Sequence, residues 1–353
     1  MAKFEMDDID RELLNLIQSS FPLDPEPFRV VGERCGVGQE EALERIQRLK
    51  GKVIRQISAI FDTRSLGYRS SLVAARVNPT RLEEAARVFN EHPGVSHNYR
   101  RNHEFNLWFT IAVPPDSRIG LERTVQLLGE LAGVDSIRML PTLRLYKIGV
   151  QLDVTGKQNV TRKATEAAYS DRDREIPKGQ PLTEADKGLI RELQKDIPLV
   201  VRPFDPAAQA LGIETEALLA GAQSLLDRKL MRRYSAVLHH REAGFRANAM
   251  GVWAVPEDRA DEVGAKMASY AAVSHCYLRP TYEDWPYNIF TMVHGRTVKE
   301  CEAVLGAIAE ETGIREMRAL YSTKEYKKTR VNYFTPEMEA WEEKYLPRVG
   351  LGA

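Results

Sequence analysis

The chain has 353 residues, which is room for several domains that each have a hydrophobic core. Its 50 Lys and Arg residues balance 50 Asp and Glu residues, so no net charge draws it to nucleic acid or an anionic membrane. No apolar run approaches the roughly 20 residues that span a bilayer, and from the acidic start we expect no signal peptide. Three scattered cysteines argue against a disulfide framework and favour a reducing cytoplasm.

Residues 1–62 predict a helix-turn-helix domain. Apolar residues at helical spacing indicate helices near 7–18, 28–35 and 40–50, and a strand over 53–60 follows them. Residues 63–150 predict a second domain with the elements strand 71–77, helix 80–91 with Thr80 as N-cap, strands 95–101 and 105–113, helix 117–131 and an extended stretch 134–146. This β-α-β-β-α-β order is that of a ferredoxin-like domain.

The same series begins again after a polar, charged stretch, residues 151–181, which we expect to be a linker. The sequence predicts a second helix-turn-helix domain over 182–240, a second ferredoxin-like domain over 241–330 and a C-terminal helical tail over 331–353, with Thr335 as N-cap and Pro336 at the first helical position. The predicted fold class is α+β, a tandem repeat of a winged helix-turn-helix and a ferredoxin-like domain. We expect the two ferredoxin-like sheets to pack as an intramolecular pseudo-dimer.

One polar string occurs in both halves. Val95-Ser96-His97-Asn98-Tyr99-Arg100-Arg101 returns as Val273-Ser274-His275-Cys276-Tyr277-Leu278-Arg279, and each copy precedes an aromatic-Asn-apolar run, Phe105-Asn106-Leu107-Trp108 or Tyr287-Asn288-Ile289-Phe290. Alternate residues of a strand share a face, so the His, Tyr and Arg of each copy should point the same way. An apolar core does not require this trio, and its repetition therefore indicates function.

The two copies are not identical. The second half has an additional stretch, Glu283-Asp284-Trp285-Pro286, and His294 where the first half has Ala112. We expect one productive site that draws mainly on the second half and is closed by residues of the first. Cys276, beside the motif, should face away from His275 and Tyr277 because neighbouring strand residues point to opposite faces.

The helix-turn-helix segments resemble those of the Lrp/AsnC transcription factors, through Asp7–Leu14, Arg45–Leu49, Gly51–Ile54 and Phe61–Gly67. A recognition helix, however, presents cations and amides to bases and phosphates. Here the first candidate begins Gly38-Gln39-Glu40-Glu41, and the second, over 212–220, has two carboxylates and no cation. We therefore expect no DNA binding. An Lrp/AsnC-like regulator that senses a heme or an amino acid is the alternative function, and a tetrapyrrole carrier without chemistry is another.

The strings 95–109 and 274–295 resemble the signatures of the two subunits of siroheme decarboxylases, and the whole chain resembles the fused form of that family. The resemblance implies a carboxy-lyase that removes the C12 and C18 acetate carboxyl groups of siroheme. The products are 12,18-didecarboxysiroheme and carbon dioxide, in heme d1 or siroheme-dependent heme b biosynthesis. It implies no cofactor and no resident metal. The implied partners are siroheme and its product, other tetrapyrrole-pathway enzymes and further copies of the chain, without a membrane.

Siroheme is a flat, anionic iron tetrapyrrole, so its site requires an aromatic slot, cations for carboxylates and a proton donor or iron ligand. The catalytic candidates are His275, His97, Tyr277 and Tyr99, and whether His275 or His97 donates a proton or ligates the substrate's iron stays open. The candidates that bind carboxylates are Arg279, Arg101 and Arg100, with Lys147 and Lys327 as further contacts. The other substrate-binding candidates are Trp285, Tyr287, Asn288, His294, Trp108 and Asn106.

Overall fold

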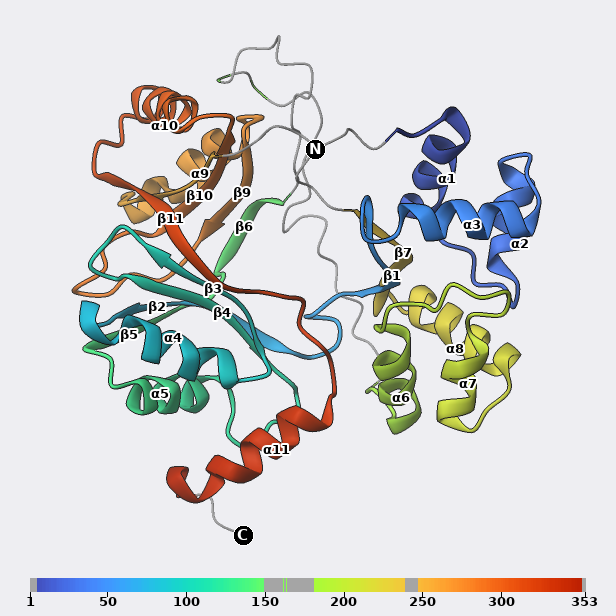
Figure 1. Cartoon of the computed structure of the whole chain (residues 1–353). Coiled ribbons are helices and arrows are strands. Elements are labelled where there is room, and N and C mark those ends of the chain that lie inside the picture. The colour runs from blue at the N-terminus through green and yellow to red at the C-terminus, as the bar shows by residue number, and fades with distance from the viewer. Residues whose placement is uncertain (1–4, 149–160, 162, 164–180, 239–246, 351–353) are drawn as a thin grey trace. The chain divides into compact units, whose positions relative to one another are not determined.

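A computed structural model describes residues 5–148, 161, 163, 181–238 and 247–350 (Figure 1). The chain divides into two compact units. The first consists of Met1–Tyr68, Ile176–His240 and Asn332–Pro336, and the second of Arg69–Glu175, Arg241–Val331 and Glu337–Ala353. The first unit therefore holds both helix-turn-helix domains and the second holds both ferredoxin-like domains. The predicted linker, 151–181, lies almost wholly outside the described residues.

The helix-turn-helix domains form as predicted, and in the first domain the helix ends lie within a few residues of the expected positions. Their helices are α1 (Asp8–Ser19), α2 (Pro27–Arg34) and α3 (Gln39–Leu49) in the first domain and α6 (Glu184–Leu193), α7 (Asp205–Leu211) and α8 (Thr215–Asp227) in the second. Strands β1 (Ile54–Phe61) and β7 (Met231–Leu238) follow the two domains and pair antiparallel, with Ser58 opposite Ser235. The repeat thus forms an intramolecular pair.

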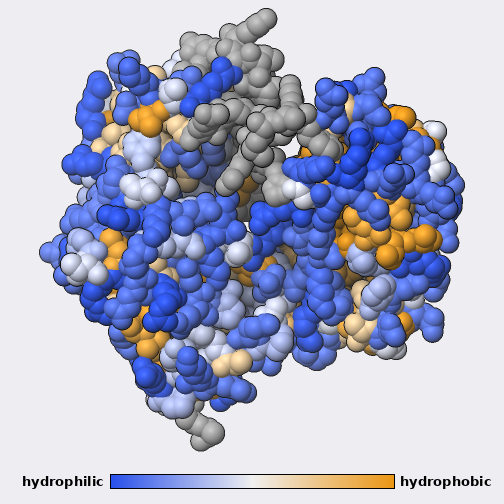
Figure 2. Space-filling model, viewed as in Figure 1, coloured by the Kyte–Doolittle hydropathy of each residue, from blue (hydrophilic) through white to orange (hydrophobic). Residues whose placement is uncertain are grey.

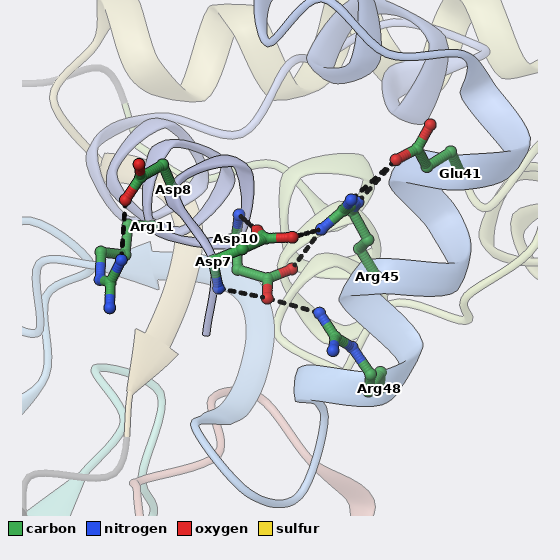
Figure 3. A network of polar contacts seen from close by, with 7 residues as sticks. All are labelled: Asp7, Asp8, Asp10, Arg11, Glu41, Arg45 and Arg48. Atoms are coloured by element: carbon green, nitrogen blue, oxygen red, sulfur yellow. Dashed lines mark hydrogen bonds and ion pairs between the residues drawn. The ribbon is translucent and has the colours of Figure 1, made fainter. Parts of the chain in front are cut away.

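A buried aspartate ties the first helix of each domain to the last. Asp10 is fully buried, and its carboxylate contacts both Arg45 and Arg48 of α3 (Figure 3). Arg45 also lies 2.7 Å from Asp7, the N-cap of α1. In the second domain Asp186 accepts hydrogen bonds of 2.8 and 3.1 Å from Arg228. The two arginines of α3 are therefore engaged with carboxylates inside the domain, a role that competes with phosphate binding.

Part of the surface of the first unit is apolar. Val200, Val201 and Ile213 are 46%, 48% and 40% exposed, and Figure 2 shows hydrophobic side chains gathered over the helix-turn-helix unit. A DNA-binding surface needs cations that replace the counterions of the phosphate backbone. The apolar side chains and the paired arginines both support the expectation that this unit does not bind DNA.

Each ferredoxin-like module has the predicted β-α-β-β-α-β order. The first consists of β2 (Arg69–Arg76), α4 (Leu82–Glu91), β3 (Val95–Arg101), β4 (Leu107–Val113), α5 (Leu121–Ala132) and β5 (Ser136–Leu140). The second consists of β8 (Ala247–Trp253), α9 (Ala260–Ala268), β9 (Val273–Leu278), β10 (Ile289–Gly295), α10 (Val298–Thr312) and β11 (Met317–Lys328). The predicted N-cap at Thr80 is wrong, because the Asn78 side chain accepts the Thr80 N–H and caps a short 3₁₀ turn, η1 (Pro79–Arg81), before α4.

The last strand of each module continues into the other module. The extended stretch of the first module is interrupted at 141–143 and resumes as β6 (Arg144–Ile148), which pairs with β9. Strand β11 pairs first with β8 and then, from Ser322 onward, with β3. The described strands form a sheet of order β5-β2-β4-β3-β11-β8-β10-β9-β6. Its two edge strands, β5 and β6, follow each other in the chain with only residues 141–143 between them. The two ends of the sheet therefore lie close together, and the sheet curves to form the predicted pseudo-dimer.

Helices cover the outer faces of this sheet, α4 and α5 over the first module and α9 and α10 over the second (Figure 1). The inner faces of the two modules share an apolar cluster that includes Trp108, Met250 and Phe290. The additional stretch of the second module joins this cluster through Trp285. Its neighbour Asp284 forms a two-pronged ion pair of 2.8 and 2.9 Å with Arg138 of β5. The stretch thereby fastens the two modules together.

The tail helix α11 (Pro336–Tyr345) begins at the predicted proline. It belongs to the second unit, where Trp341 and Tyr345 complete the core of the first module. The Trp341 ring lies 4.3 Å from the ring of buried His92. Within the described ranges, we find no helix that combines the length and the apolar character needed to cross a membrane.

Candidate active site

The repeated trios lie in two rows on the inner face of the sheet, as predicted. We name His97, Tyr99 and Arg101 of β3 the first row, and His275, Tyr277 and Arg279 of β9 the second row. In the second row the rings of His275 and Tyr277 are 6.0 Å apart, and the Arg279 guanidinium carbon is 4.6 Å from the Tyr277 ring centre. The corresponding distances in the first row are 6.2 and 5.9 Å. Strand geometry alone therefore assembles both rows.

The residues between the row members face the helices on the other side of the sheet. Cys276 is fully buried against α9, with its Sγ 3.6 Å from the Gly264 carbonyl oxygen. Asn98 donates hydrogen bonds to Ala86 and Asn90 of α4. The prediction that Cys276 faces away from His275 is confirmed.

The strand exchange sets residues of the opposite module against each row. Leu145 of β6 pairs with Tyr277, whereas Glu325 of β11 pairs with Tyr99. Burial and the Glu325 carboxylate raise the pKa of Tyr99 to about 12. The first row thus has the Glu325 carboxylate beside Tyr99 and Lys328 opposite His97, whereas the second row has the apolar side chain of Leu145 beside Tyr277.

Arg101 and Arg279 are buried cations, each 8% exposed, and no acidic side chain of the described residues forms an ion pair with them. Arg101 Nη1 donates to the Leu320 carbonyl at 3.2 Å, and Arg279 Nη1 donates to the Leu140 carbonyl. The Nε of each lacks a hydrogen-bond partner, and burial lowers the pKa of each guanidinium to about 10. Such an arrangement is costly unless a ligand supplies the negative charge.

A β-bulge in the second row brings a serine hydroxyl against the histidine. The register between β9 and β10 skips Ser274, so this residue and His275 share a side of the strand. The Ser274 Oγ lies 2.8 Å from Nδ1 of His275 and 2.7 Å from Nε2 of His294. The hydroxyl therefore joins two imidazoles and leaves Nε2 of His275 as the nitrogen that can meet a ligand.

The first row has the same bulge but a different partner. The register between β3 and β4 skips Ser96, whose Oγ lies 3.0 Å from Nδ1 of His97. On its other side the hydroxyl meets Thr110, with 2.8 Å between the oxygens. A second imidazole is thus specific to the second row.

Burial favours the neutral form of both His275 and its neighbour His294. The pKa of His275 is lowered to about 4, mainly by burial and further by His294, Arg279 and Lys147. Burial also lowers the pKa of His294. The described residues contain no group of three or more His, Cys, Asp or Glu side chains that could hold a metal ion. A neutral imidazole can donate a proton or ligate an iron that a substrate brings.

A cavity of about 670 Å³ opens beside Arg279, within the usual size range of small-molecule sites. Its walls come from the start of β6, the loop after β8, the start of α9 and the loop after β9. They include Leu143, Arg144, Val255, Asp261, Arg279 and Asn288. Arg279 thus belongs to both the cavity and the second row. His275 and Tyr277 are half-buried on the inner face and do not line this cavity.

Comparisons with known proteins decide the family. A model described as the siroheme decarboxylase NirDL-like HTH domain matches residues 10–55 and 186–232, and the AsnC-like ligand binding domain matches 65–147 and 242–327. A siroheme decarboxylase of Hydrogenobacter thermophilus is 42% identical over 334 residues, covering 94% of this chain and 96% of that protein. The chain belongs to the siroheme decarboxylase family.

Solved structures of this family agree with the fold. Crystal structures of the siroheme decarboxylase NirDL, alone and in complex with an iron-uroporphyrin III analogue, both match with a TM-score of 0.77. They are 37% and 36% identical to this chain, and each comparison covers 97% of this chain and 100% of the other. Membership of the siroheme decarboxylase family supports the enzyme over the Lrp/AsnC-like regulator.

Three predicted cations do not face the rows. Arg100 is exposed on the helix side of β3, near Glu83 of α4. Lys147 donates to the Tyr270 carbonyl at 2.7 Å, and Lys327 donates to the Asn90 carbonyl at 3.0 Å. Strand parity turns Arg100 outward, and bulges in β6 and β11 turn the two lysines toward the helices, so the structure does not bring these predicted contacts together with the rows.

Two predicted asparagines are engaged by the backbone. The side-chain amide of Asn106 donates a hydrogen bond to the Val77 carbonyl at 2.7 Å and accepts one from the Val77 N–H at 3.1 Å. The amide of Asn288 makes the same two hydrogen bonds with Val255, at 2.8 and 2.9 Å. Both therefore hold the end of a neighbouring strand. We give them a structural role and leave them out of the proposed substrate contacts, although Asn288 borders the cavity.

The predicted aromatic slot is filled in this structure. Trp285 is fully buried, Trp108 is 1% and Tyr287 7% exposed, and their rings pack against one another. The prediction that they line an open slot needs correction, because the additional stretch of the second module carries Trp285 into the apolar cluster between the modules.

Ser274, Glu325 and Leu145 were not among the predicted site residues. A signal existed for the serine, since Ser96 and Ser274 occur at the same place in the repeated string. No local pattern marks Glu325 or Leu145, because only the exchange of strands between modules brings them to the rows.

Proposed function

We propose that this protein is a siroheme decarboxylase that converts siroheme to 12,18-didecarboxysiroheme by removing the C12 and C18 acetate carboxyl groups as carbon dioxide. Membership of the siroheme decarboxylase family supports this proposal. The observation that carries it is Arg279, a buried guanidinium without an acidic partner that belongs to both a polar row and a cavity. An anionic substrate supplies the missing charge.

We propose the second row as the productive one. Leu145 leaves it without a negative charge, whereas Glu325 sets a carboxylate beside Tyr99 of the first row. An acetate arm of siroheme would be repelled there, so His97, Tyr99 and Arg101 form the weaker candidate. The second row is still completed by the first module, through Leu145 and the Leu140 carbonyl that holds Arg279.

Each residue of the second row has a task that suits its chemistry. Arg279 binds a carboxylate of siroheme, through a guanidinium geometry that matches carboxylates. His275 donates the proton that the arm needs once carbon dioxide has left, through its Nε2. Tyr277, stacked between the two, orients the substrate. His294 acts behind His275 and not as a direct substrate contact.

The reaction needs no cofactor beyond the substrate. Each step breaks the bond between an arm's methylene carbon and its carboxyl carbon, releases carbon dioxide and adds one proton to the methylene. The electron pair stays on the arm, stabilised by the conjugated macrocycle, so no outside oxidant or reductant is required. We assign the product to heme d1 or siroheme-dependent heme b biosynthesis.

We also propose the setting of the enzyme. Its three cysteines are unpaired, which suits the reducing cytoplasm. A homo-oligomer and contacts with other tetrapyrrole-pathway enzymes would allow the product to pass on without release.

The test is anaerobic incubation of the purified full chain with siroheme, followed by mass spectrometry of the tetrapyrrole. Loss of two carbon dioxides is expected. Binding of siroheme without mass loss would indicate a carrier. Salt-dependent binding of duplex DNA together with no mass loss would indicate a regulator.

A further inference from the structure

The Ser274 hydroxyl forms a bridge between two imidazoles. Its oxygen lies 2.8 Å from Nδ1 of His275 and 2.7 Å from Nε2 of His294, with the Met292 carbonyl more distant at 3.3 Å. The side chain is 1% exposed, so water does not compete for it. A hydroxyl donates one proton and accepts others, and it can therefore donate to one imidazole while accepting from the other.

We infer that Ser274 is a positioning residue that relays protons from His294 to His275. This inference deepens the proposed function and rests on it. When carbon dioxide leaves an acetate arm, the arm's methylene takes a proton from Nε2 of His275. The Ser274 hydroxyl gives its proton to Nδ1 of His275 and receives the Nε2 proton of protonated His294. One bond to hydrogen forms at carbon, and His294 ends neutral.

The relay explains how one histidine can serve two decarboxylations. A neutral imidazole that lost its only proton would become an anion, which is unfavourable in a half-buried site. A simultaneous proton from Ser274 keeps His275 neutral throughout. Before the second step a proton from solvent adds to Nε2 of His275, the Nδ1 proton returns to Ser274, and Ser274 returns its proton to Nε2 of His294. The second arm can then react in the same way.

The first row lacks this device. Ser96 makes the same contact with His97, but its other neighbour is the hydroxyl of Thr110, and Ala112 stands where the second half has His294. A threonine hydroxyl has no spare proton near neutral pH. The relay is therefore confined to the row that also lacks an opposing carboxylate.

The surroundings of His275 suit proton transfer. The titratable groups that face it are His294 on β10 and Tyr277 on its own strand, and the charges of Arg279 and of Lys147, which points to the helix side of β6, also act on its pKa. No carboxylate of the described residues is among the groups that shift the pKa of His275. Among the described residues no carboxylate pairs with His294, and burial lowers the pKa of this histidine, so its protonated form gives up the proton readily.

The test compares S274A, S274T and H294Q with S96A as the matched control in the first module. S274A and H294Q should each lower kcat by about 10² and leave KM for siroheme unchanged. S274T keeps the hydroxyl and should recover most of the activity. The double variant S274A/H294Q should lose no more than either single variant, because the two residues act as a unit. S96A should behave as wild type.

A pH profile gives a readout that a structural role would not move. Wild-type kcat should fall as pH rises through the pKa of His294, and this limb should be absent in S274A and H294Q. Wild-type kcat and pH profile in both variants would overturn the relay. So would equal losses in S274A and S274T at an unchanged melting temperature. A wild-type protein that releases no carbon dioxide from siroheme would refute the proposed function instead.

Discussion

Glu325 lies opposite Tyr99 in the register between β11 and β3. At the equivalent point between β6 and β9, Leu145 lies opposite Tyr277. The two rows therefore differ in charge although their own residues are the same. For an anionic substrate we propose that this difference favours the second row over the first.

A carboxylate introduced beside the second row should disable it. L145E is expected to raise KM for siroheme by about tenfold or more, because the new carboxylate repels the carboxylates of the substrate. A tenfold change corresponds to about 1.4 kcal/mol of binding free energy. The matched change E325L should leave KM unaltered. Steady-state release of carbon dioxide measures both, and the opposite pattern would assign catalysis to the first row.

Removal of the buried guanidinium should weaken binding more than folding. R279M is expected to lower siroheme affinity by about 10², while the melting temperature changes little or rises, because a buried unpaired cation is replaced by an apolar chain. R101M should change stability similarly and leave affinity intact. Absorbance titration and calorimetry separate the two effects, and a large loss of stability with normal binding would contradict the ligand role of Arg279.

Stability should fall in mild acid because of His92. Burial, with a smaller effect of Lys327, lowers the pKa of this histidine to about 3, from an ordinary value of 6.5. The unfolded chain therefore binds a proton near pH 6.5 that the folded chain refuses, and the stabilisation present above 6.5 is lost as pH falls toward 3.

H92Q should reduce the slope of the unfolding free energy against pH by one proton, which is about 1.4 kcal/mol per pH unit. Urea unfolding at several pH values between 6.5 and about 5 measures the slope. Because the pKa of His275 is also lowered, to about 4, some slope should remain in the variant. An unchanged slope in H92Q would show that His92 is protonated in the folded protein.

Asp10 should be important for the first helix-turn-helix domain. D10N leaves Arg45 and Arg48 without their buried partner and is expected to cost about 3 kcal/mol in the free energy of unfolding. The control is D8N. The ion pair between Asp8 and Arg11, drawn beside Asp10 in Figure 3, lies on the surface and should contribute little. Equal effects of the two changes on thermal unfolding would refute this role of Asp10.

Strand parity let the sequence place His275, Tyr277 and Arg279 on one face and Cys276 on the other, because alternation is a local property of the backbone. The same local rules predicted the order of helices and strands in both halves. The prediction of Thr80 as a helix N-cap failed because Asn78 caps the turn that begins at the following proline.

The sequence by itself determined the tandem repeat, the two ferredoxin-like modules and the composition of the two rows. Only the tertiary structure decided that β6 and β11 cross between modules, which brings Leu145 to one row and Glu325 to the other. It also decided that Arg279 is buried and that Trp285 fills the apolar cluster. These features depend on contacts between residues more than a hundred positions apart, and such contacts leave no periodic signal in the chain.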